Sequence, residues 1–272
     1  MTTPEPTTAT DTAIASAKVE LRAVDLRFGA PDRGHLAVRD VNLRLGDGEF
    51  LSIVGPSGCG KSTLLKLVAG LLRPTQGRVL LDGRPISAVP PHVGLVFQND
   101  ALLPWRTVAD NVRFPLTLRR GSRREQQRRV AELLEMVGLT RFADFFPRQL
   151  SGGMRKRVAL ARTLAHDPEV LLMDEPFGPL DAQTRIRLGG EFLALWESVG
   201  KSVMFVTHDV EEAIALSDRV VVMSAAPGHI KAEFVVDLPR PRDFYEIRFD
   251  ERFKELHREI WHQLAAEHGA DE

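Results

Sequence analysis

Apolar and polar residues alternate along the first part of the chain with the period of β-strands. Segments 19–28 and 36–45 carry apolar side chains at every second position, which predicts two antiparallel strands with one buried face each. Segment 50–54 is short and mostly apolar, and it leads directly into a glycine-rich run. We expect a strand there, followed by a loop and a helix, because apolar residues recur at helical spacing over 61–71.

The pattern changes twice further along the chain. Between residues 98 and 150 it becomes helical, which predicts an inserted helical subdomain with helices over 107–118, 123–137 and 141–146. Further strands are predicted on both sides of this insertion, over 78–81, 93–98, 170–174, 203–207, 219–223 and 230–236. The later strands alternate with predicted helices over 181–199 and 210–216, as in a parallel sheet covered by helices. After a proline-rich break at 239–242 we expect a final amphipathic helix over 251–266.

Composition narrows the class of protein. The chain has 272 residues, of which 43% are apolar and 27% charged, enough for one large or two small globular domains. The formal net charge is −1, so the excess of Lys and Arg that binds nucleic acid is missing, and we expect no nucleic-acid partner. Cys59 is the single cysteine, which excludes an intrachain disulfide and fits a reducing compartment.

Neither a membrane span nor a secretory signal is expected. Apolar runs such as 170–173 and 220–223 are far shorter than the roughly 20 residues that cross a bilayer, so any role at a membrane would need another chain. Residues 1–17 are rich in Thr, Ala and Pro and lack the basic start and apolar stretch of a signal peptide. We predict that they form a disordered tail.

The glycine-rich run contains the strongest chemical signal. It reads Gly-Pro-Ser-Gly-Cys-Gly-Lys-Ser-Thr and matches the phosphate-binding pattern G-x-x-x-x-G-K-[ST]. Glycines let backbone N–H groups approach phosphate oxygens, and the positive N-terminus of the following helix faces the same anion. We expect Lys61 to reach the β- and γ-phosphates, Ser62 to bind Mg²⁺ and Thr63 to lie near the α-phosphate. The predicted nucleotide-contacting residues of this run are Gly55, Pro56, Ser57, Gly58, Cys59, Gly60, Lys61, Ser62 and Thr63.

Two carboxylates follow another apolar strand. Asp174 ends segment 170–174, and Glu175 comes next. Ligands collect at the carboxyl ends of strands in open α/β sheets. We therefore predict that Asp174 holds Mg²⁺ through water and that Glu175 deprotonates the attacking water. The alternative for Glu175 is a purely structural role as a cap of the next turn.

Two further features have both a functional and a plain interpretation. Cys59 lies beside Lys61 and a helix N-terminus, which predicts a thiol of lowered pKa and high reactivity; the alternative is a small residue tolerated in the loop. The run 119–129 is the densest basic stretch. It forms either a solvated helix face or a surface for anionic lipid headgroups.

Residues 150–154, Leu-Ser-Gly-Gly-Met, lie between the phosphate loop and the paired carboxylates. A Ser-Gly-Gly turn before a basic helix in this place resembles the ATP-binding cassette ATPases. The resemblance implies an α/β fold with a P-loop NTPase (RecA-like) core, an antiparallel β subdomain and an inserted α-helical subdomain, and it implies ATP and Mg²⁺ as cofactors. We accordingly expect the ATPase domain over 18–238, its helical subdomain at 99–165 and a C-terminal helical extension at 239–272.

The resemblance assigns roles to residues that would mean little alone. Gln98 is similar to the family's glutamine that contacts Mg²⁺ and the attacking water. His208 is similar to the histidine that contacts the γ-phosphate, with a structural role as the alternative. Phe28 occupies the place of the aromatic ring that stacks on adenine, and a core position is the alternative. Asp181 lies, by the same resemblance, near the seam of a dimer.

Ser151, Gly152 and Gly153 are predicted to form a second anion site. In the family this turn completes the nucleotide site of a partner chain. The resemblance therefore implies a head-to-tail dimer, with a second copy or a close homologue, that encloses two ATP molecules. Met154 and Lys156 replace glutamines that are common at their positions. We expect neither to remove activity, because the serine hydroxyl and the glycine amides make the phosphate contacts.

Several segments resemble the ATPases of importers for nitrate, taurine and aliphatic sulfonates, namely 99–111, 147–157, 211–219, 227–230 and 238–242. In that family the segment after the glutamine receives a short helix of the membrane permease, and Leu103 and Trp105 are the residues predicted to contact it. The implied partners are an integral membrane permease and, indirectly, a solute-binding protein. The implied location is the cytoplasmic face of the bacterial cell membrane, as a peripheral protein.

Two other assignments stay open. One is the cassette ATPase of an exporter or lipid-transport system, which the region of Trp105 disfavours. The other is a cassette ATPase without a transport role, as in DNA maintenance or translation. Such proteins usually carry long coiled insertions or duplicated cassettes, and the sequence shows neither. The solute is selected by the permease and the binding protein, so this chain does not name it.

Overall fold

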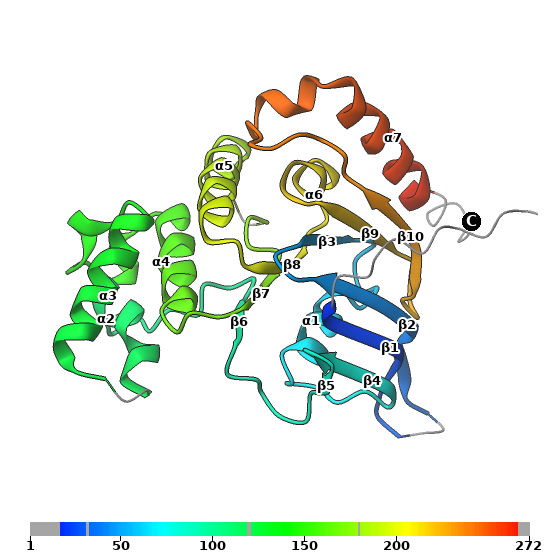
Figure 1. Ribbon diagram of the computed structural model, residues 1–272, viewed down its shortest axis with the longest axis horizontal. Coiled ribbons are helices and arrows are strands. Elements are labelled where there is room, and N and C mark those ends of the chain that lie inside the picture. The colour runs from blue at the N-terminus through cyan, green and yellow to red at the C-terminus, as the bar shows by residue number, and fades with distance from the viewer. Residues whose placement is uncertain (1–16, 31–32, 119–120, 179, 266–272) are drawn as a thin grey trace, which may run out of the picture.

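The computed structural model describes residues 17–30, 33–118, 121–178 and 180–265. Within these ranges the chain forms a four-stranded sheet, a six-stranded sheet and a group of helices set to one side of both (Figure 1). This is the α/β arrangement that the sequence predicts. The tail predicted over 1–17 lies outside the described residues except for Ala17, which already begins the first strand.

The four-stranded sheet is antiparallel, in the order β2-β1-β4-β5. Its long strands are β1 (Ala17–Phe28) and β2 (His35–Gly46), and their pairing confirms the prediction from alternation. β4 (Gln76–Leu81) pairs with β1, and the short β5 (Arg84–Pro85), which the sequence analysis missed, pairs with β4.

The six-stranded sheet has the order β10-β9-β3-β8-β7-β6. Its strands are β3 (Phe50–Val54), β6 (Val93–Val96), β7 (Val170–Asp174), β8 (Ser202–Val206), β9 (Arg219–Met223) and β10 (Ile230–Val235). All of these pairs are parallel except the pair of β10 with β9. The parallel arrangement expected for 230–236 was therefore wrong. The connection over 224–229 is too short for the crossover that a parallel pair requires.

The helices divide between two places. Around the six-stranded sheet lie α1 (Lys61–Val68), α5 (Ala182–Val199), α6 (Val210–Leu216), the 3₁₀ turn η4 (Glu246–Phe249) and α7 (Glu251–Ala265). The group set to one side consists of α2 (Val108–Arg113), η1 (Phe114–Leu118), α3 (Arg123–Met136), η2 (Thr140–Phe142), η3 (Pro147–Gln149) and α4 (Gly152–Leu164). The single helix predicted over 107–118 is split into α2 and η1, because Pro115 has no N–H with which to continue the i→i−4 hydrogen bonds of the helix.

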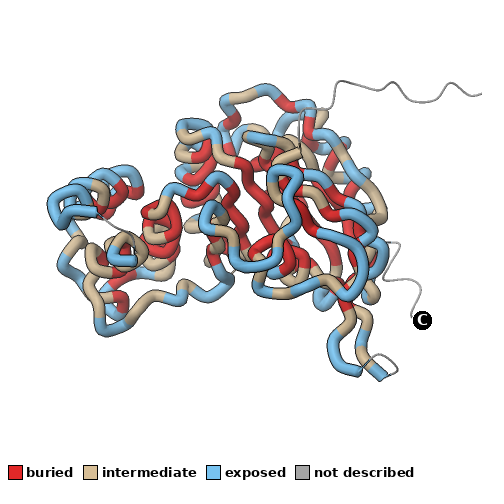
Figure 2. The backbone as a smooth tube through the Cα atoms, turned by 60° about the horizontal axis from the view of Figure 1, so that its bottom comes forward, coloured by how far each residue is buried: buried red, intermediate tan, exposed pale blue. Residues whose placement is uncertain are grey.

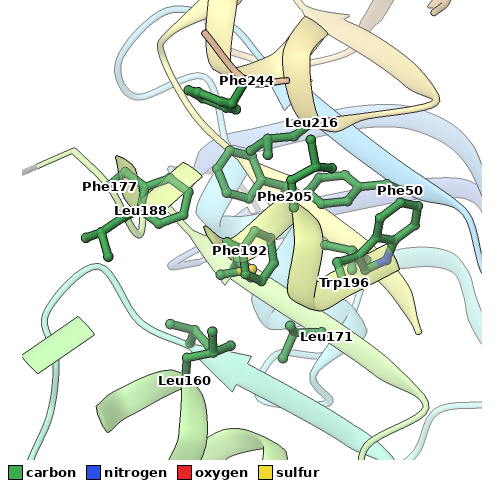
Figure 3. Close-up of a cluster of buried hydrophobic side chains, with 14 of the residues drawn as sticks. Phe50, Leu160, Leu171, Phe177, Leu188, Phe192, Trp196, Phe205, Leu216 and Phe244 are labelled. Carbon is green, nitrogen blue, oxygen red and sulfur yellow. The ribbon is translucent and has the colours of Figure 1, made fainter. Parts of the chain in front are cut away.

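Successive residues of the central strands point into two separate cores. Leu51 and Ile53 of β3 face the side that holds α1 and the four-stranded sheet, whereas Phe50 and Val54 face the side that holds α5 and α6. Both faces are covered, and Figure 2 shows the strands as the buried interior. The second core is aromatic: the rings of Phe50 and Trp196 meet edge to face with centroids 5.2 Å apart (Figure 3). Such a pair contributes about 0.5–1.5 kcal/mol beyond its buried area.

The C-terminal extension is docked onto α5 and α6. Arg242 is buried and donates to the main-chain oxygens of Ser217, at 2.7 Å, and Leu238, at 3.0 Å. Burial lowers the pKa of Arg242 to about 10, so the side chain stays charged at neutral pH. Phe244 lies against Gly189 of α5. α7 buries one face on the core through Phe253, Leu256 and Ile260.

No helix within the described ranges is both long enough and apolar enough to cross a bilayer. The shortness of the apolar runs in the sequence predicts this.

The contact between Phe244 and α5 gives a matched pair of substitutions. A Cβ added at Gly189 would lie 2.6 Å from Phe244 Cζ, whereas one added at Gly190 would lie an ordinary 3.6 Å from Phe244 Cβ. We expect Gly189→Ala to lower the free energy of unfolding by about 1–3 kcal/mol through overpacking. Gly190→Ala should be neutral or stabilising, because alanine favours a helix over glycine by about 1 kcal/mol. Urea unfolding measures both, and equal effects would mean that the extension is not seated on α5 as described.

Candidate active site

The main-chain register of three strands places the site. β8 lies between β3 and β7, and Val206 is the partner of both Ile53 and Asp174. The N–H of Glu175 then donates to the carbonyl oxygen of Val206 at 2.9 Å. The carboxyl ends of these parallel strands therefore stop at one level, and the three loops that follow them meet at one edge of the sheet.

The phosphate loop connects β3 to α1, and the nine residues predicted to contact the nucleotide form this loop and the first turn of α1. Gly58 and Gly60 have φ values of 78° and 98°, which side chains rarely adopt, so glycine is needed at both positions. Lys61 is buried, and its Nζ donates to the carbonyl oxygens of Gly55, at 2.8 Å, and Pro56, at 2.9 Å. The loop thus holds a cation at the N-terminus of α1, an arrangement that suits a phosphate group.

Ser62 and Asp174 face each other across the edge of the sheet. Ser62 Oγ donates to Asp174 Oδ1 at 2.7 Å. Burial raises the pKa of Asp174 above its usual range, the bond from Ser62 opposing that shift. A hydroxyl and a carboxylate in contact are oxygen donors of the kind that Mg²⁺ prefers, with phosphate oxygens completing the set. Among the described residues no cluster of three or more His, Cys, Asp or Glu side chains could hold a metal.

Two of the three predicted catalytic residues converge on one oxygen atom of the third. Gln98 Nε2 lies 3.3 Å from Glu175 Oε2, and His208 Nδ1 lies 3.3 Å from the same oxygen. Glu175 has a φ of 42°, which turns the chain sharply after β7. The carboxylate is partly exposed, with 22% of its side chain accessible. This geometry fits a group that binds and orients a water molecule at the end of the phosphate loop.

The Ser-Gly-Gly turn starts α4. Ser151 is the N-cap, and its Oγ accepts a hydrogen bond from the N–H of Met154 at 3.3 Å. The turn packs on the start of α5, because a Cβ at Gly153 would lie 3.1 Å from Leu188 Cδ1. Asp181 caps α5 by accepting from Thr184 N at 3.0 Å, and this bond keeps the pKa of Asp181 low.

Phe28 and Trp105 are both exposed, by 44% and 72% respectively, so a core position does not hold for either. Leu103, half-buried, lies in the same loop as Trp105.

Asn111 fixes the loop that carries Leu103 and Trp105. Its side chain accepts from Leu103 N at 2.8 Å and donates to the carbonyl oxygens of Leu103, Arg106 and Thr107. The sequence analysis missed Asn111, which looks like an ordinary polar residue of a helix.

The structure contradicts the predicted reactivity of Cys59. The thiol is fully buried, and burial raises its pKa in spite of Lys61 Nζ, which lies 3.9 Å from Sγ. The positions of Lys61 and of the helix N-terminus were predicted correctly. The desolvation of the thiolate outweighs their attraction.

A buried ionic network behind the site was also missed. Arg185 of α5 donates to Asp209 Oδ2 at 2.9 Å and to the carbonyl oxygen of Leu180 at 3.1 Å. Glu212 accepts from Thr207 Oγ1 at 2.8 Å, and burial raises the pKa of Glu212 to about 7. The only signal in the sequence is the run of acidic residues after His208, which is equally typical of a solvated helix start.

Comparisons with known proteins give the class. A family model described as "ABC transporter" matches residues 38–178. The chain thus belongs to the ABC transporter family of ATP-binding cassettes, and the resemblance stated from its motifs is confirmed. It is an ATPase that binds ATP, with the P-loop NTPase fold of that family.

Its relatives include import proteins. The chain is 42% identical to the "Taurine import ATP-binding protein TauB" of Roseobacter denitrificans, over 89% of this chain and 94% of the relative. It is 46% identical to the "Nitrate import ATP-binding protein NrtD" of Synechococcus elongatus, over 85% of this chain and 86% of the relative. The dimeric ATP-binding cassette MJ0796, solved with ADP and Pi, superposes with a TM-score of 0.71 at 35% identity, over 81% of this chain and all of that one.

The burial of Cys59 leads to a prediction for chemical labelling. We expect iodoacetamide to modify Cys59 about tenfold or more slowly in the folded protein than in urea near neutral pH, since a buried thiol of raised pKa is seldom ionised. Mass spectrometry over time measures both rates. Rapid labelling of the folded chain that ATP suppresses would restore the sequence-based prediction of a reactive thiol.

Proposed function

We propose that this chain is the ATP-hydrolysing subunit of an importer for a small anionic or zwitterionic solute of the nitrate, taurine or aliphatic sulfonate type. The observation that carries the catalytic part is the meeting of Gln98 and His208 on Glu175 Oε2, beside the Ser62–Asp174 pair. The relatives named for taurine and nitrate import support the proposed solute class. We assign the ATPase domain to 18–238, its helical subdomain to 99–165 and the extension to 239–272.

In this proposal the phosphate loop holds ATP. Lys61 and the loop N–H groups bind the β- and γ-phosphates, and Phe28 stacks on adenine. Ser62, Asp174 and Gln98 would hold Mg²⁺, which neutralises charge on the phosphates when bound. Water attacks the γ-phosphorus, a proton passes to the Glu175 carboxylate, and the bond from the γ-phosphorus to the bridging oxygen breaks to release ADP. His208 donates to a γ-phosphate oxygen as negative charge shifts during the transfer.

A second chain completes each site. Ser151 Oγ accepts from Met154 N through a lone pair, and this bond leaves the hydroxyl proton able to donate to an anion. Gly152 and Gly153 add main-chain N–H groups at the start of the same helix. We propose that this turn binds the phosphates held by the partner's loop, with Asp181 at the seam. The dimeric state of the cassette MJ0796 in two solved structures supports this arrangement.

The transport role requires contact with a permease. Trp105 presents a large exposed aromatic ring, and Asn111 fixes the loop that carries it and Leu103. An exposed aromatic anchor in a fixed loop suits a protein interface. We propose that a permease docks here, that a solute-binding protein delivers the substrate, and that the chain works at the cytoplasmic face of a bacterial membrane. The described part of 99–165 supports this over a role in DNA maintenance, because its longest helix has 14 residues and forms no long coiled arm.

The catalytic assignment predicts a trapped complex. Glu175→Gln should leave ATP binding intact and lower kcat by about 10²-fold or more, since the amide cannot accept the proton of water. The variant should therefore form a stable ATP-bound dimer, visible by size-exclusion chromatography with Mg-ATP. Adding Ser151→Ala to Glu175→Gln should weaken that dimer. A Glu175→Gln protein that stays monomeric, or turns over like wild type, would contradict the assignment.

The docking assignment can be tested with a pair of tryptophans. Trp105→Ala should weaken assembly with the cognate permease about thirtyfold, the equivalent of roughly 2 kcal/mol, and reduce solute uptake. ATPase activity of the isolated chain should persist. Trp261, exposed by 58% on α7, provides the control, and Trp261→Ala should leave assembly unchanged. Unchanged assembly with Trp105→Ala would refute the docking site, and lost ATPase activity would show that Trp105 supports the fold instead.

A further inference from the structure

Lys156 of α4 reaches back to the residue that faces the proposed water site. Its Nζ donates to the main-chain oxygen of Gln98 and lies 2.9 Å from Asp100 Oδ1 as an ion pair. The lysine side chain is 8% exposed and Asp100 19% exposed.

The other cations of α4 near Lys156 contact residues 100 and 101 and do not reach Gln98. Arg155 pairs with the other oxygen of Asp100, with Nε 3.1 Å from Oδ2. Arg162 donates to the main-chain oxygens of Asp100, at 3.0 Å, and Ala101, at 2.7 Å. Three cations of α4 therefore hold the segment 100–101. Among the hydrogen bonds of the described residues, the bond from Lys156 is the one that joins α4 directly to Gln98.

Apolar packing holds α4 on the core but leaves a gap beside it. Val158 and Ala161 of α4 are buried in the same apolar core as Phe192 of α5. A cavity of about 260 Å³ remains between the insertion and the core, and Leu160 of α4 and Met173 of β7 are among the residues that line it. The polar contacts to residues 98–101 add directional bonds to this packing.

A buried ammonium group also resists displacement. Leaving Lys156 without its partners would cost several kcal/mol, because a charge removed from water needs paired groups. The carbonyl oxygen of Gln98 is thus held at one point, while the side chain of the same residue reaches Glu175 Oε2. Shifts of about 1 Å in a positioning group can cost 10²-fold in rate.

We propose that Lys156 is a positioning residue for ATP hydrolysis, which fixes Gln98 against Glu175 and ties it to the helix that begins with Ser151. The inference rests on the proposed roles of Gln98 and Glu175. It links two sites of the dimer: the helix that offers Ser151 to the partner's phosphates also holds Gln98 in its own site. A shift of α4 on dimer closure would then move Gln98 with it.

A double-mutant cycle tests this on the full-length chain. Lys156→Met keeps the length of the side chain without the donor. We expect it to lower kcat about tenfold or more in the wild-type background, with KM for ATP changed by less than about twofold. In a Gln98→Ala background the same substitution should have no further effect on kcat, because the Gln98 side chain through which Lys156 acts is already absent. Lys156→Gln, which retains an amide donor, should recover most of the activity, and Arg155→Gln is the control that leaves Gln98 untouched.

Each outcome decides the proposal. An equal fall in kcat in both backgrounds, or an equal fall with Arg155→Gln, would show that Lys156 only supports the fold and would overturn it. If Lys156→Met does not fold, Asp100→Asn replaces it, and a fall in kcat that disappears in the Gln98→Ala background is again expected. Should Gln98→Ala alone leave kcat unchanged, the proposed role of Gln98 fails, and the positioning role of Lys156 fails with it. Failure of Lys156 alone leaves the proposed ATPase mechanism standing.

Discussion

The main-chain register among β3, β8 and β7 is the constraint on which the site depends. Parallel strands repeat their hydrogen bonds evenly, so a shift of one residue would move a whole loop and turn each side chain to the opposite face. Here Val206 is aligned with both Ile53 and Asp174. That alignment sets the heights of the phosphate loop, Glu175 and His208 at once. The two cores on either face of the sheet keep the register, because each strand has alternating side chains committed to different layers.

The helical insertion is attached by a different principle. The strands are fixed by apolar burial on both faces, whereas α4 meets the segment after Gln98 through Arg155, Lys156 and Arg162. Charged contacts of this kind are directional and hold a specific atom at a specific place. They add to the apolar packing of α4, which shares the core with α5 through Val158 and Ala161. The core therefore supplies a rigid edge, and the insertion supplies groups whose position can respond to a partner.

The sequence predicted most of this structure where one short pattern determines the outcome. Alternation predicted β1 and β2. The phosphate motif with its flanking strand and helix located Lys61 and Ser62 at the start of a helix, and the apolar run 170–174 located Asp174 at the end of a strand. Strand direction in β10 was missed because periodicity carries no information on it, whereas the short connection over 224–229 indicates an antiparallel pair. Cys59 was misjudged because burial depends on the assembled core, while the attraction of Lys61 is visible locally. Lys156 reaches a partner 58 residues away, which spacing alone does not indicate.

The hydrogen bonds of the Asn111 side chain affect how strongly a partner can bind at Trp105. A loop that is flexible before binding loses conformational entropy on docking, about 1–2 kcal/mol for each backbone residue that becomes fixed. The buried side chain of Asn111 takes part in four hydrogen bonds, one as acceptor and three as donor. These bonds have already ordered the segment from Leu103 to Thr107 during folding. An incoming partner therefore meets a loop in its final shape, and ordering this loop does not reduce the affinity.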